Sequence, residues 1–332
     1  MNSTTTSLLN VDIQPGKPPM LLAESNIGVA RWTTEHANAL LALVAEHGSL
    51  LVRGLGLRDI ADAEIVFRQL GVLATETEAF APRRLYSPGV YSASKWPPNQ
   101  GMCMHNELSY ALVPPGLMLF ACLTAPTSGG ATPVADSATV LDALPAELVE
   151  RFERLGWLLI RNYNDDIGVS FAEAFGTDDR RAVESYCRAN AIRFEWQPDG
   201  GLRTWQRRSA IIHHPLTARR CWFNQIAFLN EWTLAPEVHE YLVDVYGADG
   251  LPFNSRFGDG TPIAENVVQT INEVYEANTV RDRWMAGDLL LVDNIRAAHG
   301  REPFEGPREV VVAMANVVRI ADCSPTVELI GS

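Results

Sequence analysis

Hydrophobic and polar positions along the chain alternate in short runs, and helical spacing interrupts them in a few places. Helical spacing of apolar residues is found at residues 37–46, 60–70, 137–155 and 265–278, and a charged helical pattern at 165–193. Short β-rich runs stand at 49–54, 117–124, 131–135, 157–163, 210–215, 221–228, 288–292 and 310–318. Thr33–His36 has the residues of a capped helix start. Short strands with helices mostly at the start and in the middle predict an α+β fold with a β-sandwich or jelly-roll core.

No internal repeat, low-complexity tract or linker divides the chain. We therefore expect a flexible N-terminal tail at residues 1–20 and a single domain at 21–332, with a helical insertion at about 138–205. Residues 80–100 are rich in Pro, Ser, Tyr and Arg and show no clear period. This loop is either a candidate lid over a site or a plain surface crossover.

Composition narrows the choice of partners and compartment. The chain has 27 basic and 40 acidic residues, a net charge of -13, which argues against nucleic acid or an anionic membrane as the main partner. Its 5 cysteines are scattered without a C-x-x-C pair, which favours a reduced, cytoplasmic chain over a disulfide framework or a structural zinc site. Apolar runs fall short of the roughly 20 residues that a membrane span needs, and the N-terminus lacks the features of a signal peptide.

A histidine and a carboxylate stand two residues apart in His105-Asn106-Glu107. On an extended strand, residues i and i+2 point to the same face, so both side chains can reach one metal ion. Such triplets also arise by chance on solvated strand faces. His299, which follows an apolar strand ending at Asp293-Asn294, would complete a 2-His-1-carboxylate triad, which leaves open positions on Fe(II) for a co-substrate and O₂.

Arg308 precedes the apolar run 310–312, where a buried arginine is costly unless an anion pairs with it. Its planar guanidinium matches a carboxylate, and Thr132 offers a hydroxyl to the same group, so the two could hold the distal carboxylate of 2-oxoglutarate. Taken singly, these residues have ordinary structural explanations, such as a core histidine or a salt bridge. The chain has no strand-GxGxxG-helix unit and no P-loop, which makes a dinucleotide or NTP fold unexpected.

Five stretches carry a resemblance to a known family: Met104–Tyr110, Gly129–Asp136, His214–Thr217, Trp222–Gln225 and Gly287–Met314. The chain resembles the TauD/TfdA-type Fe(II)- and 2-oxoglutarate-dependent dioxygenases of the clavaminate-synthase-like group, and within them the SyrP-like amino-acid hydroxylases of nonribosomal-peptide pathways. The similarity runs from about Leu50 to Val318. It implies a double-stranded β-helix, with His105, Glu107 and His299 as iron ligands, Thr132 and Arg308 as contacts of 2-oxoglutarate, and O₂ as co-substrate.

Two positions depart from the pattern of parts of this family. The carboxylate ligand is Glu107 where many relatives carry Asp, and since halogenases replace it with a small residue, halogenation is not expected. Taurine-type members place a second arginine where this chain has Val312, which puts a sulfonate substrate in doubt.

The resemblance implies hydroxylation of an amino acid or a derivative of one in secondary metabolism, either free or tethered to a peptidyl carrier protein. Desaturation, epoxidation and cyclisation stay open, as do a different jelly-roll metalloenzyme (a cupin-like dioxygenase or a zinc hydrolase) and a non-catalytic binding protein. Candidate substrate contacts are Ser94, Lys95, Trp96, Asn99, Asn224, Gln225 and Arg301. Arg203, Arg207 and Arg208 would either meet a carboxylate or a carrier surface, or be solvated charges.

Overall fold

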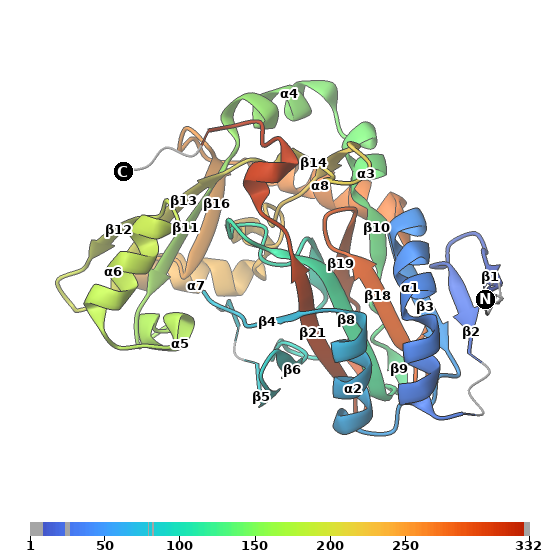
Figure 1. The fold of residues 1–332 in the computed structure, drawn as a ribbon. Coiled ribbons are helices and arrows are strands. Elements are labelled where there is room, and N and C mark those ends of the chain that lie inside the picture. Colours follow the sequence, from blue (N-terminus) through green and yellow to red (C-terminus); the bar gives the residue numbers. More distant parts are fainter. Residues whose placement is uncertain (1–8, 24–26, 79, 82, 329–332) are drawn as a thin grey trace.

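Two antiparallel sheets form the core of the computed structural model, which describes residues 9–23, 27–78, 80–81 and 83–328 (Figure 1). The larger sheet has the order β1 (Val11–Asp12), β2 (Met20–Leu22), β3 (Ser49–Arg53), β18 (Leu289–Asp293), β8 (Pro115–Thr124), β21 (Glu309–Val317), β6 (Val90–Ser92) and β5 (Leu85–Ser87), and β4 (Leu73–Ala74) also pairs with β21. All of its pairs are antiparallel except β2 with β3.

The smaller sheet has the order β17 (Thr279–Val280), β10 (Val134–Asp136), β19 (Ala297–Arg301) and β7 (Met102–His105). In its register His299 on β19 lies directly opposite His105 on β7, although the two are distant in sequence. The two sheets are those of a jelly roll, which confirms the predicted fold class.

Side chains alternate between the two faces of the larger sheet, as a strand with both faces buried requires. Phe120, Leu290 and Val312 point to one face and share a hydrophobic cluster with residues of the smaller sheet. Leu119 and Leu291 point to the other face and pack with α1 (Val29–His47) and α2 (Ile60–Leu70). For this reason the sequences of these strands are continuous apolar runs. The face that carries Phe120, Leu290 and Val312 is turned toward the smaller sheet.

The helix predicted over 60–70 is confirmed by α2. The capped start predicted at Thr33–His36 is wrong, because α1 begins earlier, at Val29, after Gly28. Thr33 is buried within the helix, and the Thr34 hydroxyl donates to the carbonyl oxygen of Ala30, one turn back, instead of capping an end.

A third sheet, with the order β12 (Arg193–Trp196), β13 (Leu202–Arg208), β11 (Trp157–Tyr163) and β16 (Phe253–Phe257), stands beside the jelly roll in Figure 1. It carries α5 (Phe171–Phe175) and α6 (Arg180–Ala189). Within the segment 138–205, expected to be a helical insertion, the strand predicted at 157–163 is confirmed by β11, whereas β12 and the start of β13 were not expected. The helix expected over 137–155 is two helices, α3 (Ser137–Ala143) and α4 (Ala146–Leu155), interrupted at Pro145, which precedes the first turn of α4.

The remaining elements are short pairs and surface helices: β9 (Ser128–Gly129) with β20 (Phe304–Glu305), β14 (Ile211–His213) with β15 (Arg220–Trp222), η1 (Glu231–Thr233), α7 (Pro236–Tyr246), α8 (Glu265–Ala277) and η2 (Ile320–Cys323). The strand expected over 221–228 ends at Trp222, because the Asn224 side chain accepts the N–H of Ile226 and starts a turn. The strand expected over 131–135 begins only at Val134, after Pro133, which has no N–H to donate.

Two expected irregular segments contain strands. Residues 1–8 of the expected tail lie outside the described residues, but β1 at Val11–Asp12 already pairs with β2. The loop 80–100, hereafter the lid segment, includes the hairpin β5–β6, and β6 pairs with β21 of the larger sheet. Because β5 and β6 are three residues long and lie among Pro, Ser and Tyr residues, the sequence showed no clear alternation of apolar and polar positions there.

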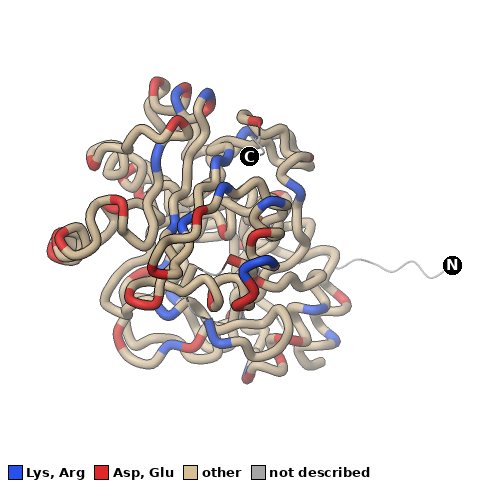
Figure 2. Tube along the Cα trace, turned by 90° about the vertical axis from the view of Figure 1, so that its left-hand side faces the viewer, with Lys and Arg blue, Asp and Glu red and all other residues tan. Residues whose placement is uncertain are grey.

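Charged residues of both signs are interspersed along the chain trace in Figure 2. In the part of the chain that the structure describes, no helix is long and apolar enough to cross a membrane.

Candidate active site

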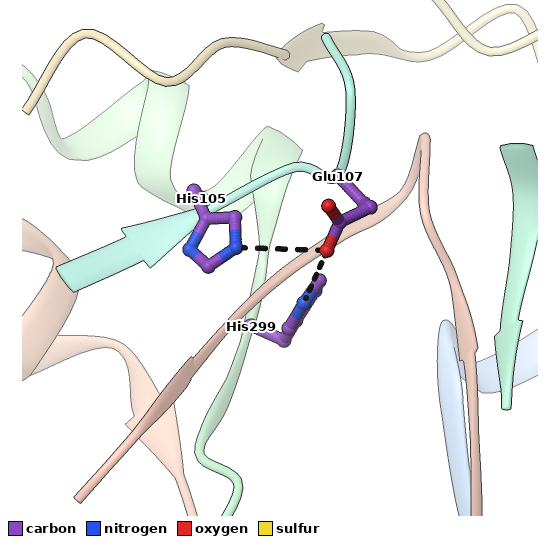
Figure 3. Close-up of side chains that lie close together, drawn as sticks. All are labelled: His105, Glu107 and His299. Carbon is purple, nitrogen blue, oxygen red and sulfur yellow. Dashed lines mark ion pairs between the residues drawn. The ribbon is translucent and has the colours of Figure 1, made fainter. Parts of the chain in front are cut away.

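Two histidines and one glutamate converge between the sheets. His105 ends β7, Glu107 follows two residues later, and His299 lies in the middle of β19 (Figure 3). The Nε2 atoms of His105 and His299 lie 3.8 and 3.6 Å from Oε2 of Glu107, and the three residues are 3%, 4% and 5% exposed for His105, His299 and Glu107. One ligand atom from each residue lies within 4.8 Å of the others. Two imidazoles and one carboxylate in this arrangement suit a metal with open positions.

Their protonation states also suit a metal, which binds neutral imidazole and ionised carboxylate. The Nδ1 atom of His105 is 2.8 Å from the carbonyl oxygen of Cys103, which places the proton on Nδ1 and leaves the Nε2 lone pair facing the other two residues. Burial lowers the pKa of His299 to about 4. Burial acts to raise the pKa of Glu107, but Arg83 and the two histidines outweigh it and hold that pKa well below its usual range.

Asn294, at the turn after β18, holds the backbone of Glu107 in place. Its Oδ1 accepts the N–H of Glu107 at 2.7 Å, and its Nδ2 donates to the carbonyl oxygens of Glu107 and Pro115 at 2.9 and 2.8 Å. The residue after Glu107, Leu108, has a φ of 50°, a left-handed conformation that a branched side chain rarely adopts. Asn294 therefore fixes a strained turn that carries a candidate ligand.

Replacing Asn294 by alanine is expected to lower the free energy of unfolding by about 2–4 kcal/mol, because it leaves buried peptide groups of Glu107 unpaired. Urea denaturation of the metal-free protein measures this, with Asn266→Ala on the exposed face of α8 as the matched control. Equal stability of the two variants would contradict the role given to Asn294.

A cavity opens beside the triad. It is lined by the three ligand candidates, the polar residues Arg83, Ser94, Thr132, Arg301 and Arg308, and a mainly apolar remainder of Ala93, Met102, Phe120, Gly300, Val310 and Val312. The structure thus brings both predicted 2-oxoglutarate contacts to the same cavity as the triad.

Arg308 lines this cavity and is partly buried. Its Nε donates to the carbonyl oxygen of Gly130 at 3.1 Å, and within the described residues it forms no salt bridge. Burial, together with the nearby charge of Arg301, lowers its pKa to about 10. A buried guanidinium without an anion is costly, so a carboxylate ligand fits this position, and the hydroxyl of Thr132 lines the same cavity.

The lid segment contributes some of the predicted substrate contacts to this cavity. Ser94 lines it, and its hydroxyl accepts from Nε of Arg83 at 3.1 Å. Trp96 is half-buried with its ring centroid 5.8 Å from that of Phe228. Lys95 and Asn99 are exposed and do not line the cavity.

Two other predicted contacts, Arg301 and Asn224, bind the backbone of the chain itself. Arg301 lines the cavity, but its guanidinium donates to the backbone oxygens of Trp96, Pro97 and Gln100, at 3.1, 2.6 and 2.7 Å, and so anchors the lid segment to β19. The Asn224 side chain donates a hydrogen bond to the carbonyl oxygen of Ala210 and accepts one from the N–H of Ile226. Asn224 and Gln225 are buried outside the cavity lining.

The three arginines of β13 also lie outside the cavity lining. Arg203 pairs with Asp249 at 3.4 Å, and Arg207 donates to the carbonyl oxygen of Leu155. Arg208 is buried and donates to the carbonyl oxygens of Tyr110 and Asn190, so it is not a solvated charge.

Sequence reasoning missed Arg83 and a buried charge network around it. Arg83 Nη2 lies 3.1 Å from Oε1 of Glu107, and its Nε lies 3.8 Å from Oε2 of Glu76. Nearby, Glu78 is fully buried, and burial raises its pKa; its carboxylate accepts from Tyr186 and Gln206. In the sequence, Arg83 appeared only as one arginine in a loop without clear periodicity, which gave no indication that it reaches Glu107.

Comparison with known proteins places these residues in a family. Residues 12–314 match the family described as taurine catabolism dioxygenase TauD, TfdA family. The chain is 36% identical over 281 residues to the dapdiamide synthesis protein DdaC of Enterobacter agglomerans, covering 83% of this chain and 84% of DdaC. It is 28% identical over 285 residues to a clavaminate synthase-like protein of Arabidopsis thaliana, covering 82% and 83% of the two chains.

Solved structures show the same fold. PvcB of Pseudomonas aeruginosa matches with a TM-score of 0.56 at 15% identity, covering 96% of this chain and 97% of PvcB. AAD-2, solved in complex with Mn(II) and N-oxalylglycine, matches with a TM-score of 0.55 at 14% identity, covering 96% and 99%. The family match over residues 12–314 and the 36% identical relative of similar extent show that the chain belongs to the TauD/TfdA dioxygenase family.

Proposed function

We propose that this dioxygenase uses Fe(II) and 2-oxoglutarate to hydroxylate an unactivated C–H bond of an amino acid or a derivative of one. Iron is held by His105, Glu107 and His299, and the distal carboxylate of 2-oxoglutarate by Arg308 and Thr132. The observation that carries this proposal is that a buried triad shares one cavity with a partly buried arginine that forms no salt bridge to any described residue.

The bound iron supplies the oxidising chemistry with O₂, and the chain supplies placement and shelter. Phe120, Val310 and Val312 give the cavity an apolar wall that keeps water from the reacting bond. Arg301 holds the lid segment against β19. Such a wall and lid let one C–H bond be aimed while competing reactions with water are suppressed.

The relatives support the substrate class. DdaC is named for dapdiamide synthesis, and one PvcB structure is described as an Fe, alpha-ketoglutarate dependent oxygenase from an isonitrile synthetic pathway. Both are biosynthetic proteins, which supports secondary metabolism for this chain, with a substrate that is either free or bound to a carrier protein. Desaturation, epoxidation and cyclisation use the same parts and are alternative outcomes.

Succinate release from 2-oxoglutarate by the Fe(II)-loaded protein, with a panel of free amino acids, tests this proposal. We expect one amino acid or a derivative to stimulate release and to gain one oxygen atom by mass spectrometry. A stimulating compound that loses two hydrogen atoms would replace hydroxylation by desaturation or ring closure. Iron binding with no succinate under any condition would favour a hydrolase or a binding protein instead.

A further inference from the structure

Arg83 lines the cavity together with Arg301 and Arg308, and no predicted role accounts for it. It lies in the lid segment, just before β5, and its side chain is 9% exposed. Its Nε donates to the Ser94 hydroxyl, and its Nη2 donates to Oε1 of Glu107. Two parts of the molecule therefore fix the plane and direction of this guanidinium.

The third nitrogen of this guanidinium, Nη1, is buried and finds no hydrogen-bond partner among the residues that the structure describes. Glu76 faces the group, but its carboxylate is 3.8 Å from Nε, which is too far for a hydrogen bond. Since Arg83 lines the cavity, a ligand there lies against this side chain. Buried donors in native proteins are nearly always paired, so a group absent from the chain itself belongs at Nη1.

Among the three arginines of the cavity, Arg83 and Arg308 are held from different sides. Arg308 is positioned by Gly130, whereas Arg83 is positioned by Ser94 and Glu107. If 2-oxoglutarate takes Arg308, the donor on Arg83 is left for the other small molecule that must enter, which is the substrate. A guanidinium of fixed plane selects a planar anion, and the carboxylate is the anion that amino acids and their derivatives carry.

We propose that Arg83 binds a free carboxylate of the substrate, so that the enzyme accepts a free carboxylic acid and not its ester or a carrier-bound thioester. This inference rests on the proposed function and narrows its substrate class. A thioester carbonyl carries no negative charge, and it would leave the buried Nη1 with a weaker partner.

Arg83 also contacts a ligand candidate, so a variant can lose activity simply because Glu107 is misplaced. The two roles differ in what they do to the preference between acid and ester. If Arg83 only orients Glu107, its removal lowers turnover of acid and ester alike. If it binds the substrate, its removal weakens binding and turnover of the free acid alone, and the preference for the acid over the ester is lost.

The test compares wild type, Arg83→Gln and the control Arg84→Gln, whose side chain is the exposed neighbour of Arg83. Free amino acids and N-acyl amino acids, each beside its methyl ester and a pantetheine thioester, are the probes. Succinate release gives kcat/KM, and anaerobic calorimetry on the Fe(II)- and 2-oxoglutarate-loaded protein gives the Kd of each probe. We expect wild type and Arg84→Gln to prefer the acid by about 10- to 100-fold, and Arg83→Gln to lose that preference.

Three outcomes would overturn the proposal: stimulation by esters or thioesters alone, stimulation by no free acid, and an acid preference that persists in Arg83→Gln. Binding of 2-oxoglutarate and basal succinate release in wild type report separately on the proposed function. Their presence together with any of these outcomes rejects the role of Arg83 and leaves the oxygenase intact.

Discussion

Replacing His299 by alanine is expected to abolish 2-oxoglutarate turnover and to weaken Fe(II) binding by more than about 100-fold, the loss that removal of a supporting partner alone can reach. The imidazole Nε2 lies 3.6 Å from the Glu107 carboxylate and directly opposite His105 in the strand register, so neither neighbour can move to replace it. Anaerobic equilibrium dialysis measures the iron that is retained, and a succinate assay measures turnover.

His213→Ala is the matched control, because this histidine lies on β14 and does not line the cavity. We expect it to bind iron like wild type. Urea denaturation of the metal-free proteins separates loss of the fold from loss of the ligand. Iron binding by His299→Ala equal to that of the control would remove His299 from the site.

Replacing Arg308 by methionine is expected to weaken 2-oxoglutarate binding by about 100-fold, a loss typical of a buried charge-assisted pair. The same change should leave the ligand-free protein as stable as wild type or more so, because an apolar side chain of similar length replaces a buried charge that has no salt bridge. Weaker ligand binding combined with unchanged or greater stability distinguishes a ligand contact from a structural one.

Anaerobic titration of the Fe(II)-loaded protein with 2-oxoglutarate measures the first effect, and urea denaturation measures the second. Arg319→Met is the control, because Arg319 pairs only with Asp322 on the surface. An Arg308→Met variant that unfolds more easily and still binds 2-oxoglutarate normally would make Arg308 a structural residue.

Local patterns in the sequence predicted the parts of the site that depend on local geometry. The two-residue spacing of His105 and Glu107 predicted that both side chains reach one site, but only His105 lies on a strand, β7, and Glu107 lies in the turn that follows. The apolar runs predicted at 288–292 and 310–318 needed only burial on both faces, and they correspond to β18 and β21. His299 was joined to them because it follows an apolar strand and because of the resemblance, and in the register of β19 with β7 it lies opposite His105.

Other features depend on contacts that no local pattern carries. Arg83 reaches Glu107 only because the lid segment folds back over the sheet, and Asn294 holds the Glu107 backbone across a separation of 187 residues. Arg301 looked like a substrate contact, yet its Nη1 and Nη2 donate to the backbone of the lid segment. The start of α1 was misplaced because Thr33 and Thr34 favour helix caps, whereas burial of Trp32 and Thr33 extends the helix to Val29.

The most direct test of the central claim is anaerobic absorption spectroscopy of the metal-free protein titrated first with Fe(II) and then with 2-oxoglutarate. We expect a weak visible metal-to-ligand charge-transfer band that saturates at one iron per chain, disappears in His299→Ala, and requires a higher concentration of 2-oxoglutarate in Arg308→Met. A protein that binds iron yet shows no such band with 2-oxoglutarate would contradict the account.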